Sequence, residues 1–188
     1  MRLAWDQTQE YMKLQTLKGI FKTPDGTTMA NMFTEFDISQ TSIDFVLGTS
    51  STNIDAKIRL LKKAVSNNVL NGGAIGGVDV LVDPEFFDKL ISHANIKNAY
   101  QYYVNNGQQA LRDDMTNYMK WGIMDHFSHR GVNFLSYDAT FNLPDGTTEL
   151  AFAASTGTAY ARGVRGLFRG YNGPSNKLSG ANQPGQEV

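Results

Sequence analysis

The chain has 188 residues, of which 41% are hydrophobic and 19% are charged, and its formal net charge is −1. This composition indicates one or two compact domains and excludes a disordered chain, and the charge gives no preference for nucleic acid or for an acidic membrane. The absence of cysteine excludes a disulfide framework, a thiolate metal site and a cysteine nucleophile. No apolar run approaches the ~20 residues of a membrane span, and the start lacks the apolar core of a signal peptide, so we expect folding in a cytosol.

Residues 1 to 18 are predicted to form a helix. Trp5, Thr8 and Met12 recur at three- and four-residue spacing, which places them on one helical face with Ala4 and Tyr11 beside them. Gly19 supplies a stop at the carboxyl end. Because no capping residue precedes the first periodic residues, we expect the helix to begin upstream of the first residue of this chain.

An eight-residue pattern occurs twice, at residues 21–28 and 141–148, and each copy places Pro-Asp-Gly between β-forming residues. Proline presets its own φ angle, aspartate bonds the local backbone and glycine takes a positive φ, so the tripeptide favours a tight turn. The repeat is too short for a domain duplication, and we interpret it as one hairpin design used twice. Apolar residues around the second turn, Val132, Tyr137 and Phe152 among them, predict paired strands there.

The clearest helical stripe lies in the middle of the chain, at residues 54–70. Its apolar members are Ile54, Ile58, Leu61, Val65 and Val69. A short apolar strand at 78–82 follows, and Asp83 and Pro84 then indicate the N-cap and first residue of another helix. The apolar face of that helix continues through Phe87, Leu90, Ile91 and Ala94. A strand that leads directly into a helix is half of an α/β unit, and a weaker helical stretch is predicted at 107–120.

Two histidines, His126 and His129, stand three residues apart and next to Asp125. On a helix this spacing brings two imidazoles within reach of one metal ion. The flanking sequence is strand-like, however, and no nearby His or Cys completes a ligand set. We therefore favour ordinary hydrogen-bonded histidines and expect neither a metal nor a cofactor.

The glycine-rich run at residues 72–77 has the composition of a phosphate-binding loop. Such a loop follows a strand and opens a helix, whereas this run follows a helix and opens a strand, and it lacks the Lys-Ser/Thr pair. We interpret it as a helix-to-strand connection. The carboxylates do not suggest acid–base chemistry either, because Asp83 and Glu85 occupy a helix N-terminus and Asp113 and Asp114 point in different directions on a helix.

Three arginines near the carboxyl end, Arg162, Arg165 and Arg169, are spaced three and four residues apart with glycines between them. They form a local positive patch, for which contact with nucleic acid and contact with another subunit are the two interpretations. We favour a subunit interface, because the charge is small and arginine is common in protein interfaces.

Several motifs, in a consistent order, carry a resemblance to a known family. The first three are a helix ending in Leu-Lys-Gly (5–19), a hairpin (20–36), and a helix–strand–helix segment with Phe-Phe-Asp-Lys-Leu and a later histidine (55–100). They are followed by a returning strand (130–137), a proline turn (143–147), and Gly-Leu-Phe (166–168) before a tail with proline and glycine (173–188). Together they resemble the lambda-type major capsid protein E family of tailed phages.

The resemblance implies the mixed α+β shell fold of tailed phages and herpesviruses, known as the Hong Kong 97 type. Residues 1–53 would hold the end of the spine helix and a hairpin of the peripheral domain. Residues 54–140 would form the axial domain, with a small sheet and flanking helices. Residues 141–188 would return toward the peripheral domain. Family members are longer at both ends, so we expect further sequence on either side of this chain.

The function implied by the resemblance is structural and not enzymatic. The protein would be the major capsid protein of a tailed phage or prophage and would assemble into pentamers and hexamers of an icosahedral shell. Its partners would be copies of itself, scaffolding or decoration proteins, and packaged DNA through non-specific contact, without a membrane. It would reside in the virion, and in the host cytoplasm during assembly. A soluble α/β ligand-binding module and a small enzyme with an unrecognised site are the alternative classes.

Overall fold

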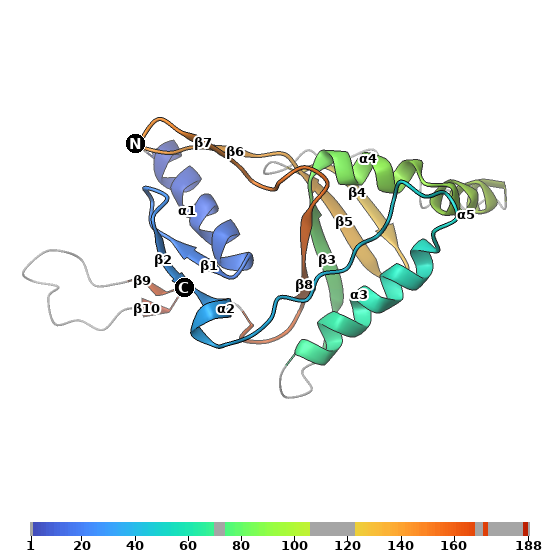
Figure 1. The fold of residues 1–188 in the computed structure, drawn as a ribbon, viewed down its shortest axis with the longest axis horizontal. Coiled ribbons are helices and arrows are strands. Elements are labelled where there is room, and N and C mark those ends of the chain that lie inside the picture. The colour runs from blue at the N-terminus through green and yellow to red at the C-terminus, as the bar shows by residue number, and fades with distance from the viewer. Residues whose placement is uncertain (1, 70–73, 106–122, 168–170, 173–185, 188) are drawn as a thin grey trace, which may run out of the picture.

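The computed structural model describes residues 2–69, 74–105, 123–167, 171–172 and 186–187. Over these residues the chain is mixed α+β, as predicted. The molecule is elongated and has two parts side by side: the helix α1 (Arg2–Leu17) with two hairpins, and a four-stranded sheet with helices against it (Figure 1). Among the described helices, none combines the length and the apolar character that crossing a membrane requires.

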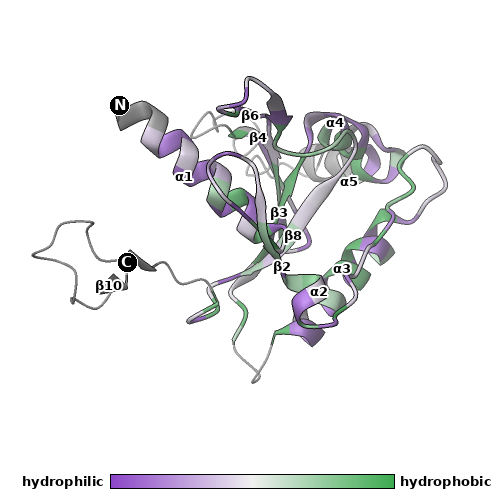
Figure 2. Cartoon of the chain, turned by 60° about the vertical axis from the view of Figure 1, so that its left-hand side comes forward, coloured by the Kyte–Doolittle hydropathy of each residue, from purple (hydrophilic) through white to green (hydrophobic). Residues whose placement is uncertain are grey.

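Helix α1 has the predicted extent, and only part of the predicted periodic set is buried. Its residues range from hydrophilic to hydrophobic along its length (Figure 2). Tyr11 and Leu14 are buried against the hairpins, whereas Trp5 is 64% exposed and Met12 is 37% exposed. Trp5 and Met12 of the predicted set therefore face outward, whereas Tyr11, predicted to lie beside them, is buried. Tyr11 and Leu14 face the hairpins, and their contacts decide how the helix is oriented about its axis.

The two predicted hairpins are both present. Strand β1 (Ile20–Lys22) pairs with β2 (Thr28–Asn31), and β6 (Thr140–Asn142) pairs with β7 (Thr148–Leu150), both antiparallel. The first hairpin leads directly into a short helix, α2 (Met32–Glu35). Each hairpin is a small sheet of its own, and α1 lies next to them (Figure 1).

The repeated Pro-Asp-Gly sequence produces the same turn twice, which confirms the prediction. The Oδ1 atom of Asp25 accepts a hydrogen bond from the amide of Thr27 at 3.1 Å, and the corresponding bond from Thr147 to Asp145 is 2.9 Å. The glycines that follow the aspartates have φ angles of 85° and 84°, a region that L side chains rarely adopt. Three residues of local sequence therefore determine both turns.

The larger sheet has the strand order β4-β5-β3-β8. Its strands are β3 (Gly77–Val82), β4 (Ile123–His129), β5 (Val132–Tyr137) and β8 (Gly157–Arg162). Strands β3 and β5 are parallel, and the other two pairs are antiparallel. A separate pair is formed by β9 (Tyr171–Asn172) and β10 (Gln186–Glu187).

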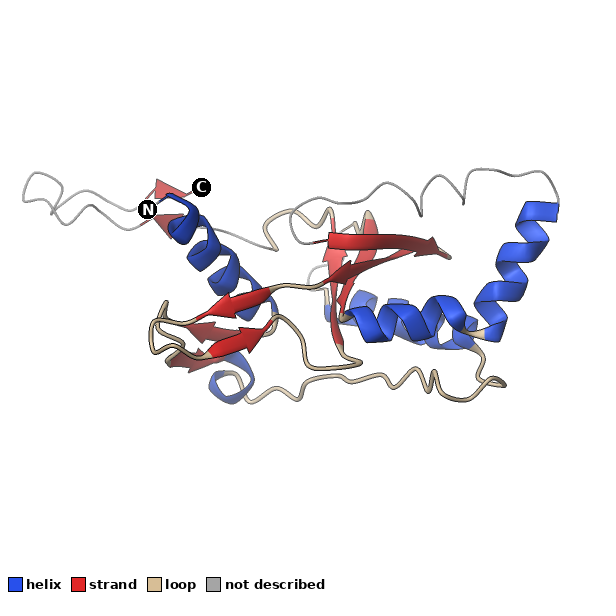
Figure 3. Cartoon of the chain, turned by 90° about the horizontal axis from the view of Figure 1, so that it is seen from above, coloured by secondary structure: helices blue, strands red, loops and turns tan. Residues whose placement is uncertain are grey.

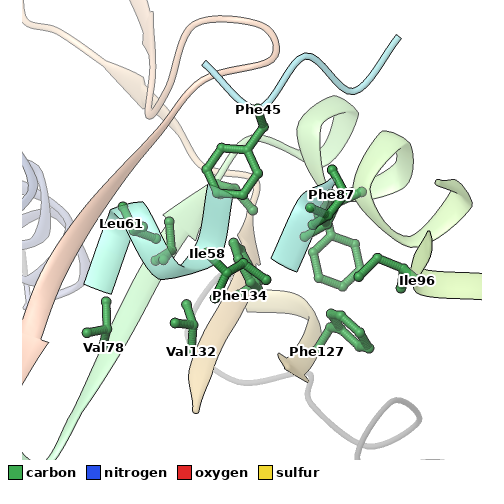
Figure 4. Close-up of a cluster of buried hydrophobic side chains, with 13 residues drawn as sticks. Phe45, Ile58, Leu61, Val78, Phe87, Ile96, Phe127, Val132 and Phe134 are labelled. Atoms are coloured by element: carbon green, nitrogen blue, oxygen red, sulfur yellow. The ribbon is translucent and has the colours of Figure 1, made fainter. Parts of the chain in front are cut away.

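Helices α3 (Ile54–Asn68) and α4 (Pro84–Ser92) pack on one face of this sheet, and α5 (Ala94–Asn105) follows α4 (Figure 3). The core between them comes from alternate strand residues and from Ile54, Ile58 and Leu61 of the predicted helical stripe, with Val65 partly buried against them (Figure 4). Its fully buried members include Ile54, Ile58, Leu90, Val82, Val132 and Phe134. Val69, the last residue of the predicted stripe, lies after the end of α3 and outside this core. A second, smaller core joins α1 to the end of β5 and to the β6–β7 hairpin and the two residues after it. Its members are Tyr11, Leu14, Tyr137, Phe141, Ala151 and Phe152.

The helix boundaries confirm some predictions and correct others. Asp83 caps α4 and Pro84 is its first residue, as expected. The single helix expected through 86–100 is interrupted at His93, whose backbone is extended, and Ala94 is exposed instead of continuing the apolar face. The His93 ring is buried, with Nε2 3.0 Å from the carbonyl oxygen of Thr49, and this contact to a distant loop holds the break. The helix predicted at 107–120 lies outside the described residues.

Candidate subunit-interaction surface

Arg162, the first member of the predicted arginine patch, ends β8 and has a partner within the chain. Its Nη1 atom is 3.6 Å from Oδ1 of Asp79, and Asn133 donates a hydrogen bond to the same oxygen at 2.7 Å. Asp79 is only 6% exposed, so its charge requires such partners. The Arg162 guanidinium also lies close over Gly77. Arg162 therefore supplies a charged partner for the buried Asp79 within the sheet.

Arg165 has a different environment. Its side chain is exposed, and it forms no ion pair within the part of the chain that the structure describes. Leu167, two residues further on, is 42% exposed. An exposed arginine beside an exposed leucine has the composition of a protein interface. Arg169 lies outside the described residues.

The two histidines considered as metal ligands both lie on strand β4 and not on a helix. Their separation of three residues places them on opposite faces of that strand. His129 is instead paired with Asp55 of α3, with Nε2 2.8 Å from Oδ1, and Arg130 donates to Oδ2 of the same carboxylate at 2.6 Å. No group of three or more potential metal ligands occurs within the described ranges. The arrangement gives His129 a structural partner that fastens α3 to the β4–β5 turn.

Asp55 is the acceptor at the centre of that contact. Burial disfavours its charged form, but the hydrogen bonds from Arg130 and His129 outweigh burial and hold the pKa of Asp55 below its ordinary value. Lys62 of α3 donates to the backbone carbonyl of Arg130 at 3.0 Å. Three hydrogen bonds, two through Asp55 and one through Lys62, therefore connect α3 to this turn.

We expect the protein to purify without stoichiometric zinc. Replacing both His126 and His129 by glutamine should leave the metal content at background, because the described geometry gives the two rings no common ligand position. Metal analysis of the wild-type and doubly substituted proteins checks this expectation. One zinc ion per chain that disappears in the double variant would contradict it.

The glycine run and the carboxylates have structural roles where the structure describes them. The amide of Gly76 donates to the carbonyl of Arg162 at 2.8 Å, and Gly77 opens β3, so the run connects helix to strand as predicted. Asp83 accepts hydrogen bonds from the amides of Glu85 and Ser155 at 3.0 and 2.9 Å. Asp113, Asp114 and residues 70–73 lie outside the described residues.

A polar cluster around Glu149 of β7 was not predicted. Its two carboxylate oxygens accept hydrogen bonds from Tyr11 at 2.7 Å, from Gln15 at 2.8 Å and from Lys22 at 2.9 Å. The cluster fastens α1 and β1 to β7 across more than 120 residues of sequence. Only the i, i+4 spacing of Tyr11 and Gln15 marks it in the sequence, and nothing there identifies Glu149 as the shared acceptor.

We expect this cluster to make stability depend on pH. Burial disfavours the Glu149 carboxylate, but the hydrogen bonds from Lys22 and Tyr11 outweigh burial, so its pKa in the folded protein lies below its ordinary value. The stabilisation is therefore present above the unfolded pKa of about 4.3 and is lost as pH falls through the folded pKa. The melting temperature of wild type should fall more steeply below pH 5 than that of Glu149→Gln, with exposed Glu35→Gln as the matched control. Identical pH profiles for wild type and Glu149→Gln would contradict this role.

Most of the charged groups described above hold elements of the fold together; they are Asp55, Asp79, Asp83 and Glu149. The exposed Arg165 and Leu167 instead suit contact with another protein. The phage major capsid protein E family matches the chain over residues 1–188, and the chain belongs to that family. This match confirms the family predicted from the sequence.

Two curated relatives agree with this assignment. The chain is 28% identical over 187 residues to the major capsid protein of Pseudomonas phage KPP10, an alignment that covers 96% of this chain and 53% of that protein. It is also 28% identical over 206 residues to the major capsid protein of Salmonella phage Felix O1 (isolate Felix O1-VT1), covering 100% of this chain and 56% of that protein. The chain thus spans about half the length of the curated relatives it matches.

Proposed function

We propose that the full-length protein is the head subunit of a tailed phage or prophage and self-assembles into pentamers and hexamers of an icosahedral shell that packages DNA. The observation that carries this proposal is the family match over residues 1–188. The proposal includes non-specific contact with packaged DNA, scaffolding or decoration proteins as further partners, and assembly in the host cytoplasm.

We also propose that the fold is of the Hong Kong 97 type, with α1 as the end of the spine helix. The two separate hydrophobic cores support a division into a peripheral domain, from residues 1–53 and 141–188, and an axial domain at 54–140. Three features cross these limits, of which the first is Tyr137 of β5, which packs in the smaller core with α1. Phe45 packs in the core of the larger sheet, and β8 pairs with β3 along its whole length.

Sedimentation velocity of the full-length protein tests the proposed function. Closed shells sediment orders of magnitude faster than a free subunit, so we expect a fast boundary that contains most of the protein. A single slow boundary from a monomer, at concentrations and salt conditions that permit association, would favour the ligand-binding module or the small enzyme instead.

The arginine patch gives a second test. Arg165→Ala and Arg169→Ala should leave the melting temperature of the isolated subunit unchanged, because Arg165 is exposed and surface substitutions rarely shift stability by more than about 0.5 kcal/mol. Both should lower the yield of particles from cells that express the full-length protein. Lys97→Ala, at an exposed position on α5, is the matched control. Normal particle yield from both arginine variants would remove the interface role from this segment.

A further inference from the structure

Charge is distributed unevenly between two consecutive stretches of the chain. Residues 23–56 contain five acidic residues and no Lys or Arg, whereas residues 57–76 contain four basic residues and no Asp or Glu. The acidic residues are Asp25, Glu35, Asp37, Asp44 and Asp55, and the basic residues are Lys57, Arg59, Lys62 and Lys63. The basic residues all lie on α3. Asp55 also lies on α3 but is paired with His129 and Arg130, so the unpaired charges of the first stretch lie outside α3.

The outer face of α3 combines cations with an exposed apolar side chain. Because Ile58 and Leu61 point into the core, helical geometry turns Arg59, Leu60 and Lys63 toward solvent. Leu60 is 53% exposed, and neither Arg59 nor Lys63 forms an ion pair with any residue in the described ranges. The alternation of hydrophilic and hydrophobic residues along α3 is visible in Figure 2.

The turn that ends α2 has the complementary composition. Glu35 and Asp37 are exposed, and beside them Phe36 is 64% exposed and Ile38 is 53% exposed. The turn is held by its backbone, since the amide of Phe36 donates to the carbonyl of Met32 at 3.1 Å and that of Ile38 to Phe33 at 3.0 Å. It therefore presents two acidic and two apolar side chains in an ordered arrangement.

We propose that the outer face of α3 in one subunit (Arg59, Leu60 and Lys63) docks on the α2 turn (Glu35 to Ile38) of a second copy of this chain. Apolar side chains at the centre with opposite charges around them are the composition of a specific protein contact. Within one chain, no ion pair between described residues joins the two surfaces. A contact between different surfaces of identical subunits is heterologous, and it repeats around a ring.

The inference rests on the proposed function, since it names a contact within the proposed shell. Packaged nucleic acid is a less suitable occupant of the α3 face. A phosphate backbone would neutralise Arg59 and Lys63 but would leave the central Leu60 without an apolar partner, whereas the α2 turn supplies Phe36 and Ile38.

Charge reversal in the full-length protein tests the contact. Lys63→Glu and Glu35→Lys should each lower particle yield by about tenfold, because each places like charges opposite one another. The protein that carries both substitutions should recover most of the wild-type yield, because the attraction is restored with its sign exchanged. Lys97→Glu, an equal change at another exposed lysine, should assemble normally. Thermal melts of each isolated subunit establish that all variants are folded.

Three results would overturn the contact while leaving the proposed shell function intact: normal assembly by both single variants, failure of the double variant to recover, or normal shells of Lys63→Glu that retain less DNA. The last result would assign the α3 face to nucleic acid. If the wild-type protein itself formed no particles, the proposed function would fail first, and this contact would fail with it.

Discussion

Replacing Phe134 by alanine is expected to lower the free energy of unfolding by about 3–5 kcal/mol. Phe134 lies on β5, between β3 and β4, and its side chain is 0% exposed. It meets the ring of Phe45 edge to face, with centroids 6.3 Å apart and planes at 88°. Truncation removes this burial and leaves a cavity among rigid strands that cannot close around it. Chemical denaturation of the isolated subunit measures the change.

Phe36→Ala is the matched control for this substitution. It deletes the same atoms from a side chain that is 64% exposed, so the expected loss is below about 1 kcal/mol. If the two substitutions destabilised the subunit equally, the position of β5 at the centre of the sheet would be wrong.

Leu61→Ala is expected to cost about 2–5 kcal/mol through lost burial and the cavity left behind. Leu61 is 9% exposed and faces the sheet, whereas its neighbour Leu60 is 53% exposed and faces outward. Leu60→Ala should therefore change stability by less than about 1 kcal/mol. The free energies of unfolding of the two variants, measured side by side, test the orientation of α3.

Comparing Leu60→Ala with Leu61→Ala also separates effects on folding from effects on assembly. Leu60→Ala should yield a stable subunit that forms fewer particles, because Leu60 is the centre of the proposed α3 docking face. A Leu60 variant as unstable as the Leu61 variant would contradict the described orientation of the helix.

Features set by neighbouring residues could be predicted from the sequence. Both Pro-Asp-Gly turns, the Asp83 cap and the buried stripe of α3 follow from short-range rules of backbone geometry and periodicity. Each of these needs no more than four residues of context. The order of such features is also what carried the family resemblance.

Features set by distant residues could not be predicted in this way. The buried face of α1 depends on the β6–β7 hairpin, more than 120 residues away, and the helix break at His93 depends on the carbonyl of Thr49. Strand β8 was not expected as part of the larger sheet, because its pairing with β3 has no local signature. The Glu149 cluster was missed for the same reason, since its four members come from three elements.

Electron cryomicroscopy of the full-length protein, expressed alone or with its accessory proteins, tests directly whether this chain builds a shell. We expect closed icosahedral shells, with α1 and the four-stranded sheet recognisable in every subunit and α3 at a contact between neighbouring copies. Dispersed monomers or small closed oligomers, under conditions in which the protein is folded, would contradict the assignment of this chain to a self-assembling shell.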